Sequence, residues 1–209
     1  MISYHCKPLA LLTMLCVVLA LSATCEAKKI YTANPGCVFL STGDSIVADG
    51  HMKISDALKK KKKLELIENP YTKQNRVRRR ISPTDIDSVR IWSPSAPEHT
   101  HKLVYIPRYG WCWEAEHGPH ICVYGYSPKG YHLSGNGGLW LRNKGKIFII
   151  KDGRIYDFGA PDGKINSKMR KELEALVADD PYCLQYVREA KGRRDKILRS
   201  LVLYSPAKQ

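Results

Sequence analysis

The chain has 209 residues, of which 44% are hydrophobic, and its 34 Lys and Arg against 20 Asp and Glu give a net charge of +14. This length suits one domain or two small ones, and the hydrophobic share is enough for a packed core. After the first 27 residues no stretch is long and apolar enough to span a membrane. The basic balance favours anionic partners.

The first 27 residues have the layout of a secretory signal peptide. Lys7 gives a positive start, residues 8–23 are apolar, and the small residue Ala27 precedes Lys28. The apolar stretch is shorter than the about 20 residues that a membrane helix needs. We therefore expect cleavage after Ala27 and export to the periplasm or cell envelope, or secretion, where nucleic acid is not an expected partner. An uncleaved anchor and a lipid on Cys25 are the alternatives.

The next part of the chain reads mainly as strands. Residues 38–41 and 45–48 flank a Thr-Gly-Asp turn signal, and residues 64–68 and 84–92 alternate apolar with polar side chains. The Pro and Ser content of residues 93–101 predicts a loop.

Three later hairpins complete the strand-rich part, and the Gly-rich segment at residues 130–143 is predicted as one of them. Residues 102–116 and 120–127 are predicted as two strands joined around Gly118 and Pro119. The segment 147–158 is the clearest hairpin, because an Asp-Gly pair, typical of a tight turn, separates its two apolar strands.

Helices are expected after Pro161. Ser167 is a predicted N-cap, and Asp180 followed by Pro181 indicates the start of a second helix. A last helix should end before Ser205. Helical spacing gives the first and last helices apolar faces of Met169, Leu173, Leu176 and Val177, and of Ile197, Leu198, Leu201 and Val202.

The predicted fold class is therefore α+β. An antiparallel β-rich core of hairpins at residues 28–165 precedes a helical segment at residues 166–209. Because the apolar helix faces need a partner, we expect both parts to form one domain.

The order of these elements resembles small exported bacterial cell-envelope proteins of unknown function. The segments that resemble them are "PTDIDSVRI" at 83–91, "KDGRIYDF" at 151–158, and the helical tail from 169 that ends near Tyr204. The resemblance implies residence in the cell envelope. It implies no reaction, because such proteins offer no established catalytic residues.

The four cysteines after the leader are Cys37, Cys112, Cys122 and Cys183. If residues 115–119 form the hairpin loop, Cys112 faces Cys122, at a distance of about 4.5–5.5 Å between Cα atoms that a disulfide accepts. A two-residue Gly-Pro loop would instead place Cys112 opposite Gly125. We expect the Cys112–Cys122 disulfide, with Cys37 and Cys183 as buried thiols or a second pair.

The same hairpin offers alternative chemistry. Cys112, His117, His120 and Cys122 could bind zinc, but they lack the tight C-x2-C spacing, and thiols oxidise in an exported protein. No recognised catalytic motif occurs. We expect no metal, no cofactor and a non-enzymatic binding or structural role. The alternative is a hydrolase or metalloprotein built on this hairpin, which would require Glu114 and the histidines to converge.

Aromatic residues crowd the same region. Trp111 and Trp113 lie two residues apart on a predicted strand and so share one face. Such rows fill a sheet core more often than they form exposed platforms for sugars. The other members are Tyr105, Tyr109, Tyr124, Tyr126, Tyr131 and Trp140.

Two basic runs lie in the first half of the chain. They indicate either a solvated loop or a site for an anionic envelope polymer or lipid head groups. The runs consist of Lys59, Lys60, Lys61, Lys62 and Lys63, and of Arg76, Arg78, Arg79 and Arg80.

Overall fold

The computed structural model describes residues 33–55, 63–70, 72, 74–143 and 145–206, all within one compact unit. The predicted signal peptide with its cleavage site, the predicted lipid position Cys25, and lysines 59–62 lie outside the described residues. Of the two basic runs, Lys63 and the arginines are described.

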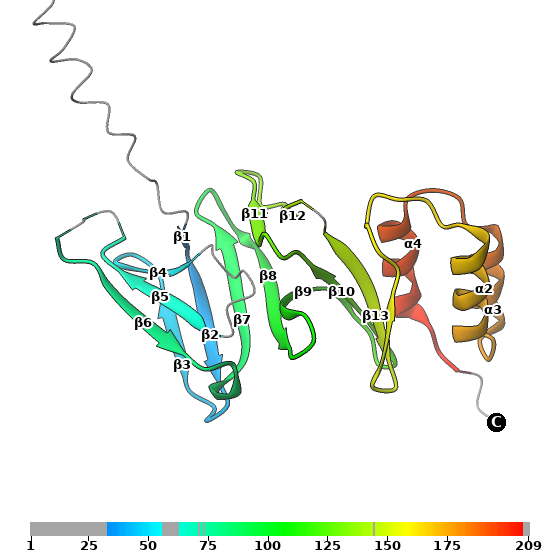
Figure 1. Ribbon diagram of the computed structural model, residues 1–209, viewed down its shortest axis with the longest axis horizontal. Coiled ribbons are helices and arrows are strands. Elements are labelled where there is room, and N and C mark those ends of the chain that lie inside the picture. Colours follow the sequence, from blue (N-terminus) through cyan, green and yellow to red (C-terminus); the bar gives the residue numbers. More distant parts are fainter. Residues whose placement is uncertain (1–32, 56–62, 71, 73, 144, 207–209) are drawn as a thin grey trace, which may run out of the picture. The chain divides into compact units, whose positions relative to one another are not determined.

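The main sheet is antiparallel and has eight strands, in the order β14-β13-β10-β9-β8-β7-β2-β3 (Figure 1). In chain order its strands are β2 (Gly36–Leu40), β3 (Ser45–Ala48), β7 (Ile86–Ser93), β8 (Ala96–Ile106), β9 (Gly110–His117), β10 (Ile121–Tyr126), β13 (Lys146–Lys151) and β14 (Arg154–Asp157).

A second antiparallel sheet has the strand order β1-β4-β5-β6, and β11 pairs with β12 in a small hairpin. The strands are β1 (Ala33–Asn34), β4 (Met52–Ser55), β5 (Leu64–Glu68), β6 (Val77–Ile81), β11 (Tyr131–Leu133) and β12 (Leu139–Leu141), and the short helix η1 spans Pro83–Asp85.

The chain ends in the helices α2 (Ser167–Leu176), α3 (Pro181–Glu189), α4 (Arg194–Ser200) and η2 (Leu201–Leu203). The predicted α+β class, with antiparallel strands first and helices last, is confirmed. Among the described residues no helix combines the length and the hydropathy of a membrane span.

Local signals explain several elements. Asp152 and Gly153 both have positive φ, as a two-residue hairpin turn requires, and they join β13 to β14. The carboxylate of Asp180 caps α3 as predicted. For α2 the prediction was wrong by one residue, because Asn166 rather than Ser167 is the N-cap and accepts a 2.9 Å hydrogen bond from Met169 N.

The predicted loop at residues 93–101 is also wrong over most of its length. Residues 96–101 begin β8, in which Thr100 pairs with Trp92 of β7 and Ala96 pairs with Ser93. The proline at 97 lies near the start of the strand, a position where a missing backbone donor is tolerated.

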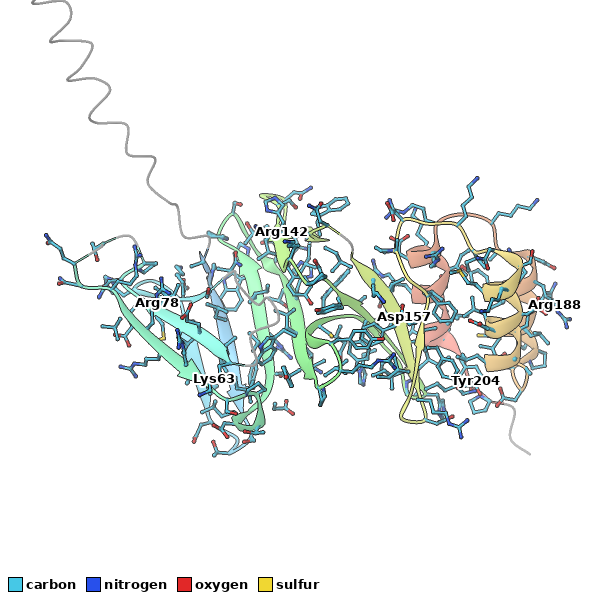
Figure 2. All side chains as sticks on the ribbon, viewed as in Figure 1. Lys63, Arg78, Arg142, Asp157, Arg188 and Tyr204 are labelled. Carbon is cyan, nitrogen blue, oxygen red and sulfur yellow. The ribbon has the colours of Figure 1, made fainter. Side chains whose placement is uncertain are left out.

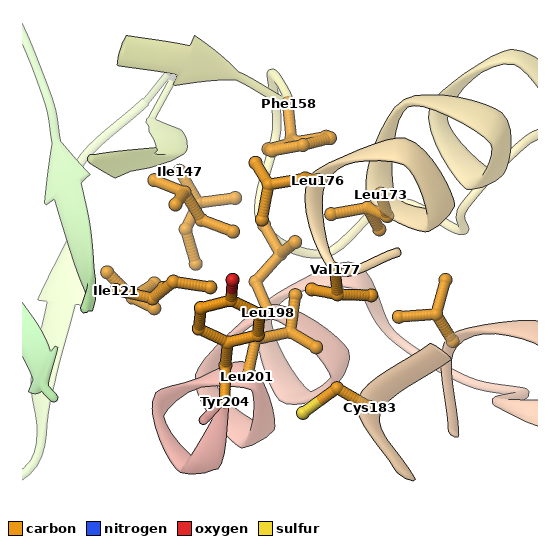
Figure 3. Packing of buried hydrophobic residues seen from close by; sticks show 13 residues of the cluster. Ile121, Ile147, Phe158, Leu173, Leu176, Val177, Cys183, Leu198, Leu201 and Tyr204 are labelled. Carbon is orange, nitrogen blue, oxygen red and sulfur yellow. The ribbon is translucent and has the colours of Figure 1, made fainter. Parts of the chain in front are cut away.

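Two buried clusters occupy the same face of the main sheet. One cluster joins Val89, Ile91 and Leu103 of the main sheet to Ile54 and Leu66 of the four-stranded sheet. The other joins β10 and β13 to the helices, and its members seen in Figure 3 are Ile121, Ile147, Phe158, Leu173, Leu176, Val177, Cys183, Leu198, Leu201 and Tyr204. Different layers therefore cover the two halves of this sheet face.

Candidate ligand-binding groove

A groove lies on this sheet face between the two covering layers. Its floor crosses three strands at Trp113 of β9, Gly125 of β10 and Ile147 of β13, and Gly125 pairs with both of the others. A Cβ atom on Gly125 would lie 3.0 Å from Trp113 and 3.3 Å from Leu141. The missing side chain therefore leaves the hollow open between two large neighbours.

The groove has a volume of about 820 Å³, comparable to small-molecule sites. The β11–β12 hairpin forms one wall with Leu139, Trp140 and Leu141. The loop at residues 160–162 and helix α4 form the other wall. Tyr131 anchors the hairpin, because its buried hydroxyl donates a 2.5 Å hydrogen bond to Trp111 O.

Two tryptophans contribute aromatic surface to the groove. Trp113 is half-buried, and the guanidinium carbon of Arg199 lies 5.8 Å from the centre of its ring. Trp140 is 59% exposed, unusual for so large an apolar side chain. Trp111 and Tyr131 are buried in the core, so the expectation of core aromatics is correct for them but not for Trp140.

Both arginines that line the groove are paired with carboxylates. Arg193 binds Asp195 through two hydrogen bonds of 3.0 Å each. Arg199 donates two hydrogen bonds to Glu116 Oε1, one of them 2.7 Å from Nε. Lys196 and Asp162 also line the groove. The groove therefore has three positive charges, on Arg193, Lys196 and Arg199. They are balanced by three carboxylates, on Asp162, Asp195 and the adjoining Glu116, so the groove has no excess charge although the whole chain is basic.

Arg194 holds one wall of the groove in place. This residue is buried, and its guanidinium donates hydrogen bonds of 2.6 Å to Ala160 O and 2.8 Å to Lys164 O. Its backbone N donates to Gly163 O, and Asp195 N donates to Pro161 O. These four bonds tie the start of α4 to the loop at 160–164, so that the exposed side chains on both segments keep a fixed spacing.

The register predicted for the 112–122 hairpin is wrong. Cys122 lies opposite His117, and Cys112 lies opposite Val104 of the neighbouring strand β8. A β-bulge in β9 shifts the register between Val123 and Tyr124, and β9 continues to His117 before the turn begins. All four cysteines after residue 33 are unpaired in this structure. Cys112 and Cys122 therefore do not lie opposite each other, which was the arrangement from which the disulfide was predicted.

The groups proposed for hydrolase or metal chemistry have separate partners. Cys122 Sγ and Glu114 Oε2 each lie 3.4 Å from the same atom, His117 Nδ1, so the two compete for it. A nucleophile relay needs the thiol and the carboxylate on different ring nitrogens. His120 packs edge-on against the ring of Tyr204, and burial raises the pKa of Cys112 to about 12.

Glu114 and Glu116 are also engaged elsewhere. Glu114 binds Lys102 at 3.1 Å and Tyr124 at 3.4 Å, and Glu116 binds Arg199. In the part of the chain that the structure describes, no group of three or more His, Cys, Asp and Glu side chains is arranged to hold a metal ion.

The arginine run forms an edge strand rather than a loop. Arg78, which is labelled in Figure 2, lies on β6 with Arg79 and Arg80. Arg78 and Arg80 share the buried carboxylate of Glu65 at 3.7 and 3.5 Å, and Arg79 pairs with Glu68 at 2.7 Å. Arg76 donates to the carbonyl oxygen of residue 70, and Lys63 immediately precedes β5. The described members thus belong to one strand pair, with Lys63 and Arg76 beyond its opposite ends.

Comparisons of this chain with protein-family models, with curated proteins and with solved structures found no match.

Proposed function

We propose that this chain is an exported, non-enzymatic binding protein of the cell envelope, and that its groove binds a glycan. The observation that carries this proposal is the combination of Trp113 and Trp140 with fixed Arg–carboxylate pairs in one groove. Tryptophan rings offer flat apolar surfaces for the C–H face of a sugar ring. Paired guanidinium and carboxylate groups offer the donors and acceptors that sugar hydroxyls need.

The charge balance of the groove favours a neutral ligand. Because Arg193 and Arg199 are already neutralised by Asp195 and Glu116, an anionic ligand would have to displace a carboxylate before it gained an ion pair. Hydroxyl groups can add to these pairs without separating them. Binding should therefore depend little on salt, since screening acts mainly on net charge.

The test is a titration of the exported protein with chito-oligosaccharides, followed by tryptophan fluorescence, together with sedimentation on purified peptidoglycan. Trp140→Ala should weaken binding at least tenfold, within the range for loss of a central aromatic contact. The matched control is Tyr182→Ala, which removes an 88% exposed aromatic ring outside the groove and should leave affinity unchanged. No binding to either probe, or equal binding by Trp140→Ala, would contradict the proposal.

The salt dependence of binding distinguishes the groove from a second candidate site, the arginine-rich strand β6. An anionic envelope polymer or lipid head groups held by Arg79 and Arg80 would bind more weakly as salt rises from 50 to 300 mM. Such binding would fall in Arg79→Gln/Arg80→Gln and persist in Trp140→Ala. This pattern would move the ligand site to β6 and reject the groove.

Export is tested separately. N-terminal sequencing of the protein recovered from the envelope fraction should begin at Lys28. An intact Met1, or a lipid on Cys25, would contradict cleavage after Ala27 and would require a membrane-attached protein.

A further inference from the structure

A second hollow, the tail groove, lies on the helical tail and has a volume of about 850 Å³. Helix α3 forms one wall, and the segment from the end of α4 to residue 206 forms the other. It shares no lining residue with the groove at Trp113 and Trp140. Its sides bear Pro181, Tyr182 and Tyr186 on α3, and Leu203, Ser205 and Pro206 on the opposite segment.

Exposed apolar side chains gather at the tail groove. Tyr182 is 88% exposed, Leu203 is 80% exposed and Tyr186 is 39% exposed. Among the described residues these are three of the six large hydrophobic side chains that are exposed. Single exposed apolar residues are common on protein surfaces, whereas several that gather in one hollow mark a binding site.

The tail groove offers no free charge, although the chain has a net charge of +14. Among the residues that the structure describes, no lysine, arginine or glutamate lines it. Its one carboxylate, on the buried Asp180, already accepts hydrogen bonds from Ser205 N at 2.8 Å and Cys183 N at 3.0 Å. An anionic lipid head group or a charged peptide would find no counter-ion there, so the occupant should be uncharged.

The apolar surface is too small for a stable dimer. The exposed parts of two tyrosines and one leucine amount to about 400 Å². Two copies of the chain that met at this surface would bury about 800 Å², less than the about 1,200 Å² of a stable interface. A short segment is the better occupant, because a few aromatic contacts can supply most of its binding energy.

The free polar groups of the tail groove are hydroxyls. Ser200 Oγ donates to Lys196 O at 3.1 Å, whereas the hydroxyls of Tyr182, Tyr186 and Ser205 have no partner among the described residues. Each free hydroxyl can donate a hydrogen bond. A polyproline II segment needs donors only, because its carbonyl groups form no internal hydrogen bonds and its prolines have no N–H.

We propose that the tail groove binds a proline-rich segment of another protein in the polyproline II conformation. Tyr182 and Tyr186 lie one helical turn apart, about 6 Å along α3, so their rings form adjacent ridges against which a proline ring can pack. Such a segment is already extended before it binds and loses little conformational entropy, so a shallow aromatic groove is enough to hold it. This site is independent of the glycan-binding groove.

The test is a titration of fluorescein-labelled decaproline with the exported chain, followed by fluorescence anisotropy. The wild type should bind, and Tyr182→Ala and Leu203→Ala should each weaken binding at least fivefold. Both side chains are mostly exposed, so neither variant disturbs the core. The matched control is Trp140→Ala, which removes an exposed ring from the other groove and should bind as the wild type does. No saturable binding below about 1 mM chain, or undiminished binding by either groove variant, would overturn the proposal.

A second set of measurements tests the chemistry of the occupant. A decapeptide of alternating glycine and serine is also uncharged but is flexible, and it should bind at least tenfold more weakly than decaproline. Equal binding of the two peptides would reject a polyproline II ligand. Because no free charge takes part, a rise from 50 to 300 mM salt should change the decaproline affinity less than twofold.

Two other occupants have their own signatures. Phosphatidylglycerol vesicles that bind the wild type but not Tyr182→Ala would assign the tail groove to a lipid surface. A dimer of the wild type that Tyr182→Ala abolishes in sedimentation would assign it to a second copy of the chain. Either result would overturn the proposal, whereas a monomeric wild type that binds decaproline and not the vesicles would support it.

Discussion

Lys151 donates a 2.7 Å hydrogen bond from Nζ to Tyr204 Oη, and Tyr204 Oη donates in turn to Asp179 Oδ2 over 2.6 Å. Lys151 Nζ also donates to Leu176 O at 2.6 Å. This relay joins β13 to the end of α2 and to Tyr204, the residue after η2, which belongs to the helical core (Figure 3). Burial, with a further effect of Asp179, raises the pKa of Tyr204 well above its usual range, so the phenol keeps its proton.

Tyr204→Phe should destabilise the fold without changing its packing. The substitution removes the hydroxyl that accepts from Lys151 and donates to Asp179, both of which are charged. Hydrogen bonds to charged groups contribute about 1.5–3 kcal/mol, so the free energy of unfolding in urea should fall by about this amount. Tyr182→Phe, on an exposed ring, is the control. A midpoint equal to that of the wild type would show that the relay has no stabilising role.

Removing the helical tail should unfold the β-rich part. The tail covers Ile121, Val123, Ile147 and Ile149 on the sheet face. Each of these side chains contributes about 1.5–3 kcal/mol by burial, whereas a whole domain has a margin of about 5–15 kcal/mol. A chain of residues 28–165 should show no cooperative thermal transition by circular dichroism. A transition at the wild-type temperature would instead mean that the sheets fold alone.

Asp180 should make the fold sensitive to acid. Its carboxylate accepts from Ser205 N at 2.8 Å and from Cys183 N at 3.0 Å, and these bonds, Ser205 first, lower the pKa of Asp180 below its ordinary 3.8. A lowered folded-state pKa gives stability that is present above pH 3.8 and is lost as the pH falls through the folded value.

The variant Asp180→Asn keeps a good N-cap but does not titrate. At pH 7 it should be less stable by about 1 kcal/mol, and the difference from wild type should shrink as the pH falls from 5 to 2.5. Urea unfolding at each pH measures this difference. The control Asp152→Asn, in the exposed turn, should differ from the wild type by the same free energy of unfolding at each pH. If the difference between Asp180→Asn and the wild type is also the same at each pH, Asp180 is not the source of the acid sensitivity.

Short-range signals predicted the fold class and several elements. The Asp152–Gly153 turn and the Asp180 cap need only neighbouring residues, so both were visible in the sequence. The strand from Ala96 was missed because its pairing with β7, not its composition, holds it extended. The bulge in β9 was missed for the same reason, and with it the pairing of Cys122 with His117.

The groove depends on what covers the sheet. Trp111 and Trp113 lie on one strand and one face, as predicted, yet the first is buried in the core and the second lines the groove. Sequence spacing cannot tell which tryptophan is buried and which lines the groove, because the layers that cover the sheet come from distant parts of the chain. One signal was available: Gly125, isolated within an apolar strand, indicates a close approach or an unfilled position. Arg193 and Arg199 had no such signal.

The thiols should differ in reactivity. Cys112 is fully buried, and burial also raises the pKa of Cys183 to about 11, whereas Cys37 and Cys122 are half-buried. At pH 8, N-ethylmaleimide should label Cys37 and Cys122 first and leave the other two until the protein unfolds. Mass spectrometry of the digest gives the sites. A bridged Cys112–Cys122 peptide in a non-reduced digest would show that the strands adopt another register.

Arg194→Lys should loosen the groove wall. The arginine reaches Ala160 O and Lys164 O with two separate nitrogens, a span that a lysine ammonium cannot reproduce. Losing one charge-assisted bond inside the protein should lower the free energy of unfolding by about 1.5–3 kcal/mol.

Arg194→Lys should increase hydrogen exchange at the groove wall more than in the sheet. The amides of Arg194 and Asp195, which donate to Gly163 O and Pro161 O, should exchange hydrogen faster in Arg194→Lys, while β9 and β10 should keep their protection. Because the loop forms one wall of the groove, chito-oligosaccharide affinity should fall by several-fold. Arg188→Lys, on an exposed side chain of α3, is the control and should change neither quantity. Unchanged exchange at both amides in Arg194→Lys would show that backbone pairing alone holds the wall, and that the buried guanidinium does not position it.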